Sequence, residues 1–399
     1  MIANIAGGVL MWAVHFLARK TGPEEYGVFL AFLAVAMCVP TMPLQMVLAQ
    51  QTAQGLATNH RGEVAGMIRL VWLASFVLWL AGVGLAVLWH AEILARWQIP
   101  NPWAFWIMLP ALLFSLWGPM FSGVLQGQQN FLWLGWVMML NGVGRLGIAA
   151  LVVVVLHAAA TGMVIGVLVG LVISGGLAIW QTRSLWSGPA LPCDWRRLLR
   201  QVFPLVLGFG AFQFLFTADT MFAKTYFASA TVGFYGSAGT LSRALMWLVG
   251  PLATVMFPRI VHSSAKSEKS NLMLMVFAGT GVLAVVGAAG LSVLGPFVVQ
   301  IIYGKAYVQL ASQVLPWYAG AMVPLALSNV LVNNLLARAS FRIVLPMCVL
   351  AGGYAFALTR FHDTPVMLLQ TTGVCSSILL VLCTGATLLD KTTAKTAAA

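Results

Sequence analysis

Three ionisable side chains fall inside long apolar stretches of this sequence, where charge is otherwise scarce. Arg145 follows Asn141 by one helical turn, Asp219 lies in a second apolar stretch, and Arg243 lies in a third. Holding a charged side chain at the centre of a lipid bilayer costs about 2.5 to 3.5 kcal/mol even on a lenient scale. Each of the three therefore needs an oppositely charged partner, a cage of polar groups or a charged ligand.

Asp219 and Arg243 can satisfy each other. They lie on consecutive apolar stretches, and counting about 1.5 Å per residue from the intervening hairpin puts them at similar depth on antiparallel helices. An internal ion pair is one interpretation. A direct contact with substrate or a coupling ion is the second, and a switch that combines both is the third.

Arg145 has no acidic residue in the apolar stretches of its own half of the chain. Its charge needs a substrate anion, a carbonyl cage or a carboxylate from the other half. A planar guanidinium suits phosphate, because it donates two parallel hydrogen bonds to neighbouring oxygens. We therefore expect Arg145 to contact an anionic substrate, with Asn141 on the same helical face.

Other polar residues have two interpretations each. His15, Arg19 and Lys20 form a basic cluster at the end of the first apolar stretch, and Lys224 lies near the corresponding end of a later one. These residues either belong to solvated loops or guide a phosphate or sugar into the transport path. Asn333 either binds sugar hydroxyls or forms hydrogen bonds between helices, and helix packing is the favoured interpretation.

The elements that must position these residues are membrane-spanning helices. Hydrophobic residues make up 61% of the 399 residues and charged residues only 8%, whereas a soluble domain usually carries about 25% charged residues. The apolar residues form blocks close to the roughly 20 residues that a helix needs to cross the hydrocarbon layer. We predict about twelve spans. They cover residues 2–17, 28–48, 70–89, 103–125, 131–156, 163–180, 202–222, 232–257, 272–294, 314–336, 343–358 and 366–389.

The net charge of +12 comes from Lys and Arg residues scattered among the breaks. A nucleic-acid surface would need them clustered on one exposed face, so no nucleic-acid partner is expected. Lys and Arg are retained on the cytoplasmic side of membrane proteins, and the breaks around Arg61, Arg69 and Arg183 carry this bias. The bias predicts that both termini are cytoplasmic.

Cysteine and histidine spacing indicates no metal site, and no cofactor is expected. The five cysteines show no C-x-x-C spacing, and the six histidines are dispersed singly. The first apolar block lacks the charged n-region of a cleavable signal peptide. This block is also short, which leaves open a start upstream of Met1.

A weak internal repeat divides the chain into two halves of six spans. Gly27-Val28-Phe29 corresponds to Gly233-Phe234-Tyr235, and residues 123–131 correspond to residues 333–341. Because six is even, both halves enter the membrane from the same side, related by a pseudo-two-fold axis along the membrane normal. We predict an all-α membrane protein in which two six-helix lobes bind a substrate between them and transport it by alternating access. The predicted parts are an N-terminal lobe 1–181, a cytoplasmic linker 182–201, a C-terminal lobe 202–389 and a cytoplasmic tail 390–399.

Three stretches carry a resemblance to a known family. They are residues 16–27 (FLARKTGPEEYG), residues 123–131 (GVLQGQQNF) and residues 219–258, which contain Val232-Gly-Phe-Tyr235, Leu241-Ser-Arg243 and Phe257-Pro258. Together they resemble the polysaccharide transporter (O-antigen flippase-like) family of the multidrug/oligosaccharidyl-lipid/polysaccharide exporter superfamily. The resemblance implies a flippase for polyprenyl-pyrophosphate-linked oligosaccharides in a bacterial inner membrane.

The implied partners are a lipid-linked anionic glycan and membrane lipids, and a coupling ion, H⁺ or Na⁺, is left open. Two other functions also stay open. A cation-coupled multidrug antiporter of the same superfamily would need an intramembrane acid, and only Asp219 is available. A membrane-embedded glycosyltransferase or polymerase would need a catalytic carboxylate in a loop, and Glu92 is the nearest candidate.

Overall fold

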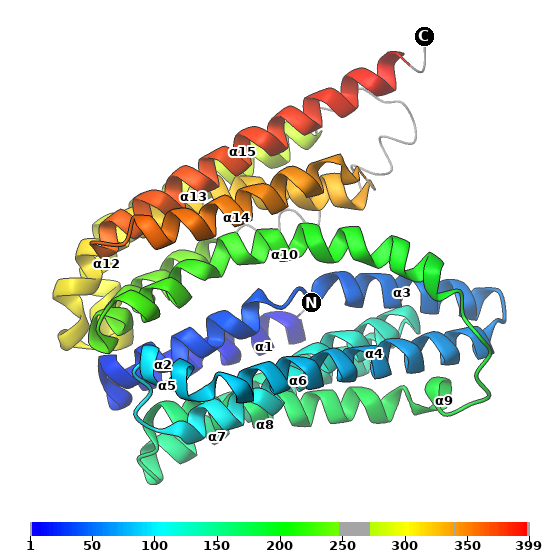
Figure 1. Ribbon diagram of the computed structural model, residues 1–399, viewed down its shortest axis with the longest axis horizontal. Coiled ribbons are helices and arrows are strands. Elements are labelled where there is room, and N and C mark those ends of the chain that lie inside the picture. Colours follow the sequence, from blue (N-terminus) through cyan, green and yellow to red (C-terminus); the bar gives the residue numbers. More distant parts are fainter. Residues whose placement is uncertain (1, 247–271, 339, 397–399) are drawn as a thin grey trace. The chain divides into compact units, whose positions relative to one another are not determined.

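The computed structural model describes residues 2–246, 272–338 and 340–396 (Figure 1). Over these ranges the chain is helical nearly throughout and contains no strand. It divides into two compact units, Met1–Val206 and Leu207–Ala399, here called unit 1 and unit 2. The predicted ends of the linker and of the tail stay predictions.

Unit 1 contains α1 (Ile2–Ala13), η1 (Val14–Leu17), α2 (Ala18–Cys38), α3 (Met42–Ala57), α4 (Arg61–Leu88), α5 (His90–Arg96), α6 (Pro102–Gly127), α7 (Phe131–Val155), α8 (Ala159–Gln181) and α9 (Arg183–Trp186). The helix α10 (Trp195–Tyr226) begins in unit 1 and continues into unit 2. Unit 2 further contains the helical residues 229–246, α12 (Leu272–Tyr303), α13 (Lys305–Ala337), η2 (Phe341–Ile343), α14 (Val344–Arg360) and α15 (Pro365–Thr396).

Ten segments of the described chain are long and apolar enough to cross a membrane. The first, Ile5–Ala57, has 53 residues, about 80 Å of helix and enough for two crossings. Counting it twice, and adding the helix that includes residues 229–246, brings the number to twelve. The predicted polytopic helical fold is therefore confirmed. Phe257 and Pro258, at the end of one predicted span, lie outside the described residues.

Large apolar side chains point outward along the spans. Leu78, Val293 and Leu345 have exposed fractions of 73%, 78% and 73%. Water would penalise so much exposed apolar surface, whereas lipid tails are as apolar as leucine and accept it.

A tight turn at Gly22 joins the first two crossings. Gly22 has φ 79° and ψ 166°, a conformation that side-chain-bearing residues rarely adopt, and Pro23 follows it with no N–H to continue the preceding helix. The turn folds Tyr26 back onto His15, whose Nδ1 lies 2.8 Å from the tyrosine hydroxyl. The stretch 16–27 therefore encodes a helical hairpin.

The hairpin between α6 and α7 has a similar structural explanation. Asn130 caps α7 by accepting a hydrogen bond from the backbone N–H of Trp133 at 3.4 Å, and Gln129 has a positive φ of 58° in the turn. Gly127 lies against α3, because an added Cβ would come within 2.6 Å of the carbonyl oxygen of Ala49. Residues 123–131 thus form a turn and a close helix contact.

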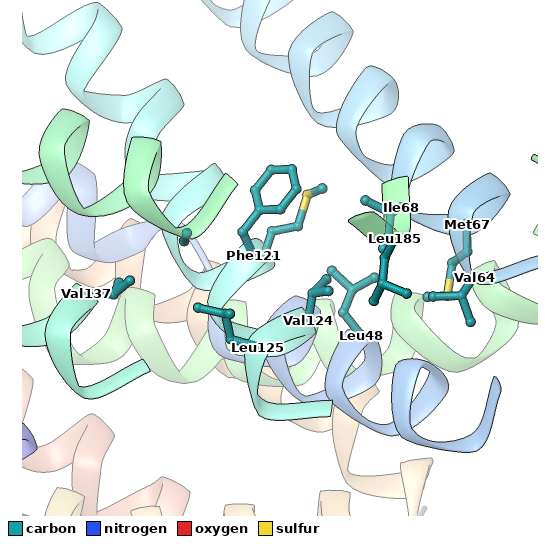
Figure 2. Close-up of a cluster of buried hydrophobic side chains, with 11 residues drawn as sticks. Leu48, Val64, Met67, Ile68, Phe121, Val124, Leu125, Val137 and Leu185 are labelled. Carbon is teal, nitrogen blue, oxygen red and sulfur yellow. The ribbon is translucent and has the colours of Figure 1, made fainter. Parts of the chain in front are cut away.

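An apolar cluster joins α3, α4, α6, α7, α8 and α9 within unit 1 (Figure 2). Leu48, Phe121 and Val124 are each at most 1% exposed, and Leu185 of α9 packs among them at 6%. In unit 2, α13 packs against α12 and α15, and α14 packs against α15. Each unit therefore has a packed helical core of its own.

The segment that follows α9 is held on α4. Arg69 donates hydrogen bonds to the carbonyl oxygens of Trp186 at 2.7 Å and Gly188 at 2.6 Å. The backbone N–H of Leu191 donates to the carbonyl of Gly62 at 2.9 Å. A Cβ at Gly66 would overlap the carbonyl of Leu191. We call residues 186–193 the strap, since they lie along the face of α4 that these contacts define.

Candidate functional site

Arg145 is positioned by the contact between α1 and α7. A Cβ at Gly7 would meet the backbone of Met138, and a Cβ at Gly142 would meet the Cβ of Leu10. The two helices therefore run parallel in close contact. One further turn along each of them brings the end of α1 and the start of η1 to the level of Arg145.

Two aromatic side chains, His15 and Tyr26, interact with Arg145. Its guanidinium lies close enough to His15 and Tyr26 to interact with them electrostatically. His15 and Tyr26 are buried and hydrogen-bonded to each other at 2.8 Å. The ring of Trp12 packs edge-on against His15, with 6.0 Å between ring centroids.

Arg145 is not neutralised by any side chain in the described parts of the chain. The two ion pairs found there, Glu92–Arg96 and Asp219–Arg243, do not include it. Its Nε is buried and has no hydrogen-bond acceptor, and the same holds for Nε1 of Trp12. Unit 1 thus contains a positive charge and two N–H donors without acceptors.

The helix α8 supports the backbone of Arg145 from another side. A Cβ on Gly170 would lie 2.6 Å from the carbonyl oxygen of Asn141 and 2.9 Å from the backbone N of Arg145. A Cβ on Gly166 would lie 2.5 Å from the carbonyl oxygen of Arg145. Close contact with α8 at Asn141 and Arg145 holds α7 in place. Substrate binding by Arg145 and Asn141 stays a prediction.

In unit 2, Asp219 of α10 has zero exposed surface and accepts three side-chain hydrogen bonds. Nη2 of Arg243 donates at 2.6 Å, and the hydroxyl of Tyr235 donates at 2.8 Å. The hydroxyl of Tyr318 of α13 is the third donor. The predicted Asp219–Arg243 ion pair is therefore confirmed.

Arg243 is satisfied by further groups besides Asp219. Its Nη2 donates to Oγ1 of Thr220 at 2.9 Å, and its Nε donates to the carbonyl oxygen of Phe216 at 3.1 Å. Its guanidinium carbon lies 5.5 Å from the ring centroid of Phe216 and 5.4 Å from that of Tyr318. The network therefore links α10, the helix that includes residues 229–246, and α13.

Sequence reasoning missed the two tyrosines of this network. Tyr318 is 99 residues from Asp219, so no short sequence spacing predicts the contact between Tyr318 and Asp219. A phenol in the middle of an apolar span was the available signal, because a buried tyrosine hydroxyl usually finds a hydrogen-bond partner.

The predicted basic cluster at the end of the first span is divided. His15 is buried beside Tyr26, whereas Arg19 and Lys20 are exposed. The separation follows from helical geometry, because His15 faces the lobe interior and the turn at Gly22 starts beyond it. The three residues therefore do not form one exposed cluster, and a role for Arg19 or Lys20 in guiding substrate stays a prediction.

Lys224 and Asn333 also differ from the predicted surroundings. Lys224 is 1% exposed, and its Nζ lies 2.5 Å from Oγ of Ser229, so a solvated loop is the wrong description. Nδ2 of Asn333 donates to the carbonyl oxygen of Asn329 at 2.7 Å and to its Oδ1 at 2.9 Å. Both residues lie on α13, so these bonds stay within one helix.

Comparisons with known proteins bear on this arrangement. Residues 67–389 match the family described as "Lipid II flippase MurJ", and no curated protein matches the chain. A solved structure of a multidrug resistance MATE family transporter of the MOP superfamily, in an inward-facing conformation, has a TM-score of 0.74. Its identity is 11%, and the match covers 98% of this chain and 99% of that chain.

Lipid II flippase MurJ in an inward closed conformation also has a TM-score of 0.74, at 14% identity over 96% of this chain and 85% of that chain. A MOP superfamily transporter from Pyrococcus furiosus, described as having a binding pocket of reverse polarity, has a TM-score of 0.56 at 10% identity. That match covers 96% of this chain and 93% of that chain. Identities this low establish the fold alone, a two-lobe, 12-helix fold. The family match covers most of the sequence, and the chain therefore belongs to the Lipid II flippase MurJ family.

Proposed function

We propose that this protein translocates a polyprenyl-pyrophosphate-linked oligosaccharide across a bacterial inner membrane by alternating access, and that Arg145 contacts its pyrophosphate. The family supplies the class of cargo. The observation that carries the assignment to a residue is the buried Nε of Arg145, which meets no acceptor among the described residues.

Phosphate oxygens fit the missing partner in charge and in geometry. A pyrophosphate diester offers several anionic oxygens, and a guanidinium can bind two of them at once. His15 and Tyr26 lie near the guanidinium without offsetting its charge by an ion pair. The site therefore favours an anion and disfavours a cation.

A cation-coupled drug antiporter is less well supported. Such a transporter needs a carboxylate that is free to take up H⁺ or Na⁺ within the membrane. The carboxylate of Asp219 already accepts hydrogen bonds from Arg243, Tyr235 and Tyr318. A cation would have to displace these donors.

An embedded glycosyltransferase has little support from the nearest loop carboxylate. Glu92 is exposed and lies 2.9 Å from Arg96 one turn later on α5. A glycosyltransferase would change the chemical species of its substrate, whereas a flippase changes only the leaflet.

The direct test uses purified protein in liposomes that contain a radiolabelled polyprenyl-pyrophosphate-linked oligosaccharide. We expect the labelled lipid to become accessible in the opposite leaflet, with its chemical form unchanged. Liposomes with Arg145→Ala protein at equal density are the comparison. A changed chemical species, or transport of cationic dyes without lipid flipping, would overturn the proposal.

The orientation is part of the proposal, with both termini in the cytoplasm. Thr58 follows α3 and Lys305 begins α13, and both residues are exposed. A single cysteine at Thr58 should resist a membrane-impermeant thiol reagent in intact cells, while one at Lys305 should react. The reverse pattern would invert the orientation.

A further inference from the structure

Trp12, Thr52 and Thr161 are side chains of unit 1, besides Arg145, with a buried polar atom that has no hydrogen-bond partner among the described residues, and Trp12 is the one that packs against His15. Its indole Nε1 is buried, and it meets no hydrogen-bond acceptor in the parts of the chain that the structure describes. Buried indole N–H groups normally find a partner. An indole N–H without an acceptor therefore points to a ligand that supplies one.

Trp12 lies at the level of Arg145 on the neighbouring helix. It precedes His15 by three residues on the α1–η1 helix, and the rings of the two residues are 6.0 Å apart. His15 in turn interacts electrostatically with Arg145. The parallel contact of α1 with α7, from Gly7 to Leu10, carries both residues to this level.

The ring of Trp12 is held by its neighbours. It packs edge-on against Phe16, with 5.9 Å between centroids and an interplanar angle of 90°. The other ring neighbour of Trp12 is His15, which is itself held by the 2.8 Å hydrogen bond to Tyr26. A donor fixed in this way loses little freedom when a ligand binds, which favours binding.

We propose that Trp12 is a second donor of the same phosphate site, so that its indole N–H and the Arg145 guanidinium bind anionic oxygens together. The inference rests on the proposed function, because it assigns a specificity residue to that site. An indole N–H can donate but cannot accept, and the same is true of a guanidinium. A site made of such donors selects acceptor-only ligands, such as phosphate oxygens, over hydroxyl and amine groups.

The test measures binding of inorganic pyrophosphate to purified full-length protein in a phosphate-free detergent, so that lipid headgroups do not compete. Trp12→Phe removes the N–H and keeps an aromatic ring against His15. We expect its affinity to fall roughly tenfold, as for loss of one hydrogen bond to a charged group. Trp136→Phe is the matched control, because Trp136 lies on α7 and is 46% exposed. It should bind as the unchanged protein does.

The outcomes separate this inference from the proposed function. Normal binding by Trp12→Phe together with lost binding by Arg145→Ala would overturn the role of Trp12 and leave the flippase proposal standing. Lipid flipping that survives Arg145→Ala would overturn the proposed phosphate contact itself. Failure of the unchanged protein to bind millimolar pyrophosphate, or equal binding of chloride, would overturn the site as a phosphate site.

A second measurement follows the tryptophan N–H groups of the unchanged protein directly. In protein labelled with ¹⁵N at the tryptophan indoles, pyrophosphate should shift one N–H resonance downfield, as a new hydrogen bond to an anion does. This resonance should be the one that is missing from the spectrum of Trp12→Phe protein. A titration in which no indole resonance shifts would overturn the proposal.

Discussion

The two units treat a buried arginine in opposite ways. Arg243 in unit 2 has a carboxylate, a hydroxyl and a backbone carbonyl as acceptors, and two aromatic rings lie close to its guanidinium. Within the described ranges, Arg145 in unit 1 has a buried Nε without an acceptor and forms no ion pair with an acidic side chain. A fully satisfied charge gives the fold one defined arrangement, whereas an unsatisfied one is available to a ligand.

This difference predicts opposite responses to substitution. Removing one partner of a buried ion pair leaves an uncompensated charge and is strongly destabilising. Removing a charge that has no partner relieves a cost to the fold and removes only what the charge binds. Residues of the Asp219 network should therefore affect stability first, and Arg145 should affect transport first.

The largest expected effect on stability comes from Asp219→Asn. The change leaves Arg243 without its counter-ion and should cost about 3 to 5 kcal/mol of unfolding free energy. Thermal unfolding of purified protein, followed by the fraction that stays monodisperse, measures the loss. The double variant Asp219→Asn/Arg243→Met should lose less than the two single variants combined, because it removes both charges. Strict additivity would argue against direct coupling.

Tyr318→Phe should lower the free energy of unfolding by a smaller amount. It removes one hydroxyl that donates to Asp219 and should cost about 1.5 to 3 kcal/mol, since the acceptor is charged. Tyr226→Phe on α10 is a suitable control, because Tyr226 is 40% exposed and stacks on His362 through its ring. If both variants unfold at the same temperature, the hydroxyl of Tyr318 does not support the network.

The smallest expected effect concerns the strap, where unit 1 depends on close packing and not on an ion pair. Burial raises the pKa of the Cys193 thiol, so little reactive thiolate is present at neutral pH. Gly66→Val on α4 should push the strap away, lower this pKa and speed reaction of Cys193 with maleimide at a fixed pH. The protein should carry Cys193 as its single cysteine.

Gly84→Val is the matched control for this experiment, because Gly84 lies on the same helix and a Cβ there would meet no neighbouring atom. The reactivity of Cys193 should be unchanged in it. Equal labelling rates for the two valine variants would mean that the contact between the strap and Gly66 does not shield the thiol.

Patterns along the sequence predicted the membrane class, the helix number and the Asp219–Arg243 pair. Each depends on local composition or on helices that follow each other in the chain. The surroundings of His15 and Lys224 were not predictable in the same way, because burial depends on which helical face packs inward. His15 is turned inward by the hairpin at Gly22, and Lys224 is buried beside Ser229.

Contacts between residues that are far apart in the sequence were also not predictable. Tyr318 reaches Asp219 from a helix 99 residues later, and Trp12 reaches the level of Arg145 through contacts between α1 and α7. The motif-like stretches 16–27 and 123–131 mainly encode a turn and a helix contact. Their resemblance to a family therefore indicates the fold more directly than it indicates the substrate site.

We propose that Arg145 serves substrate binding and not the stability of the fold. The most direct measurement is flipping of a polyprenyl-pyrophosphate-linked oligosaccharide by Arg145→Ala protein in liposomes, at equal protein density, with its thermal unfolding midpoint measured in parallel. We expect flipping to be abolished while the unfolding midpoint is unchanged or higher, and we expect Arg145→Lys to keep partial flipping because the charge remains. Normal flipping by well-folded Arg145→Ala protein would mean that Arg145 does not contact the substrate.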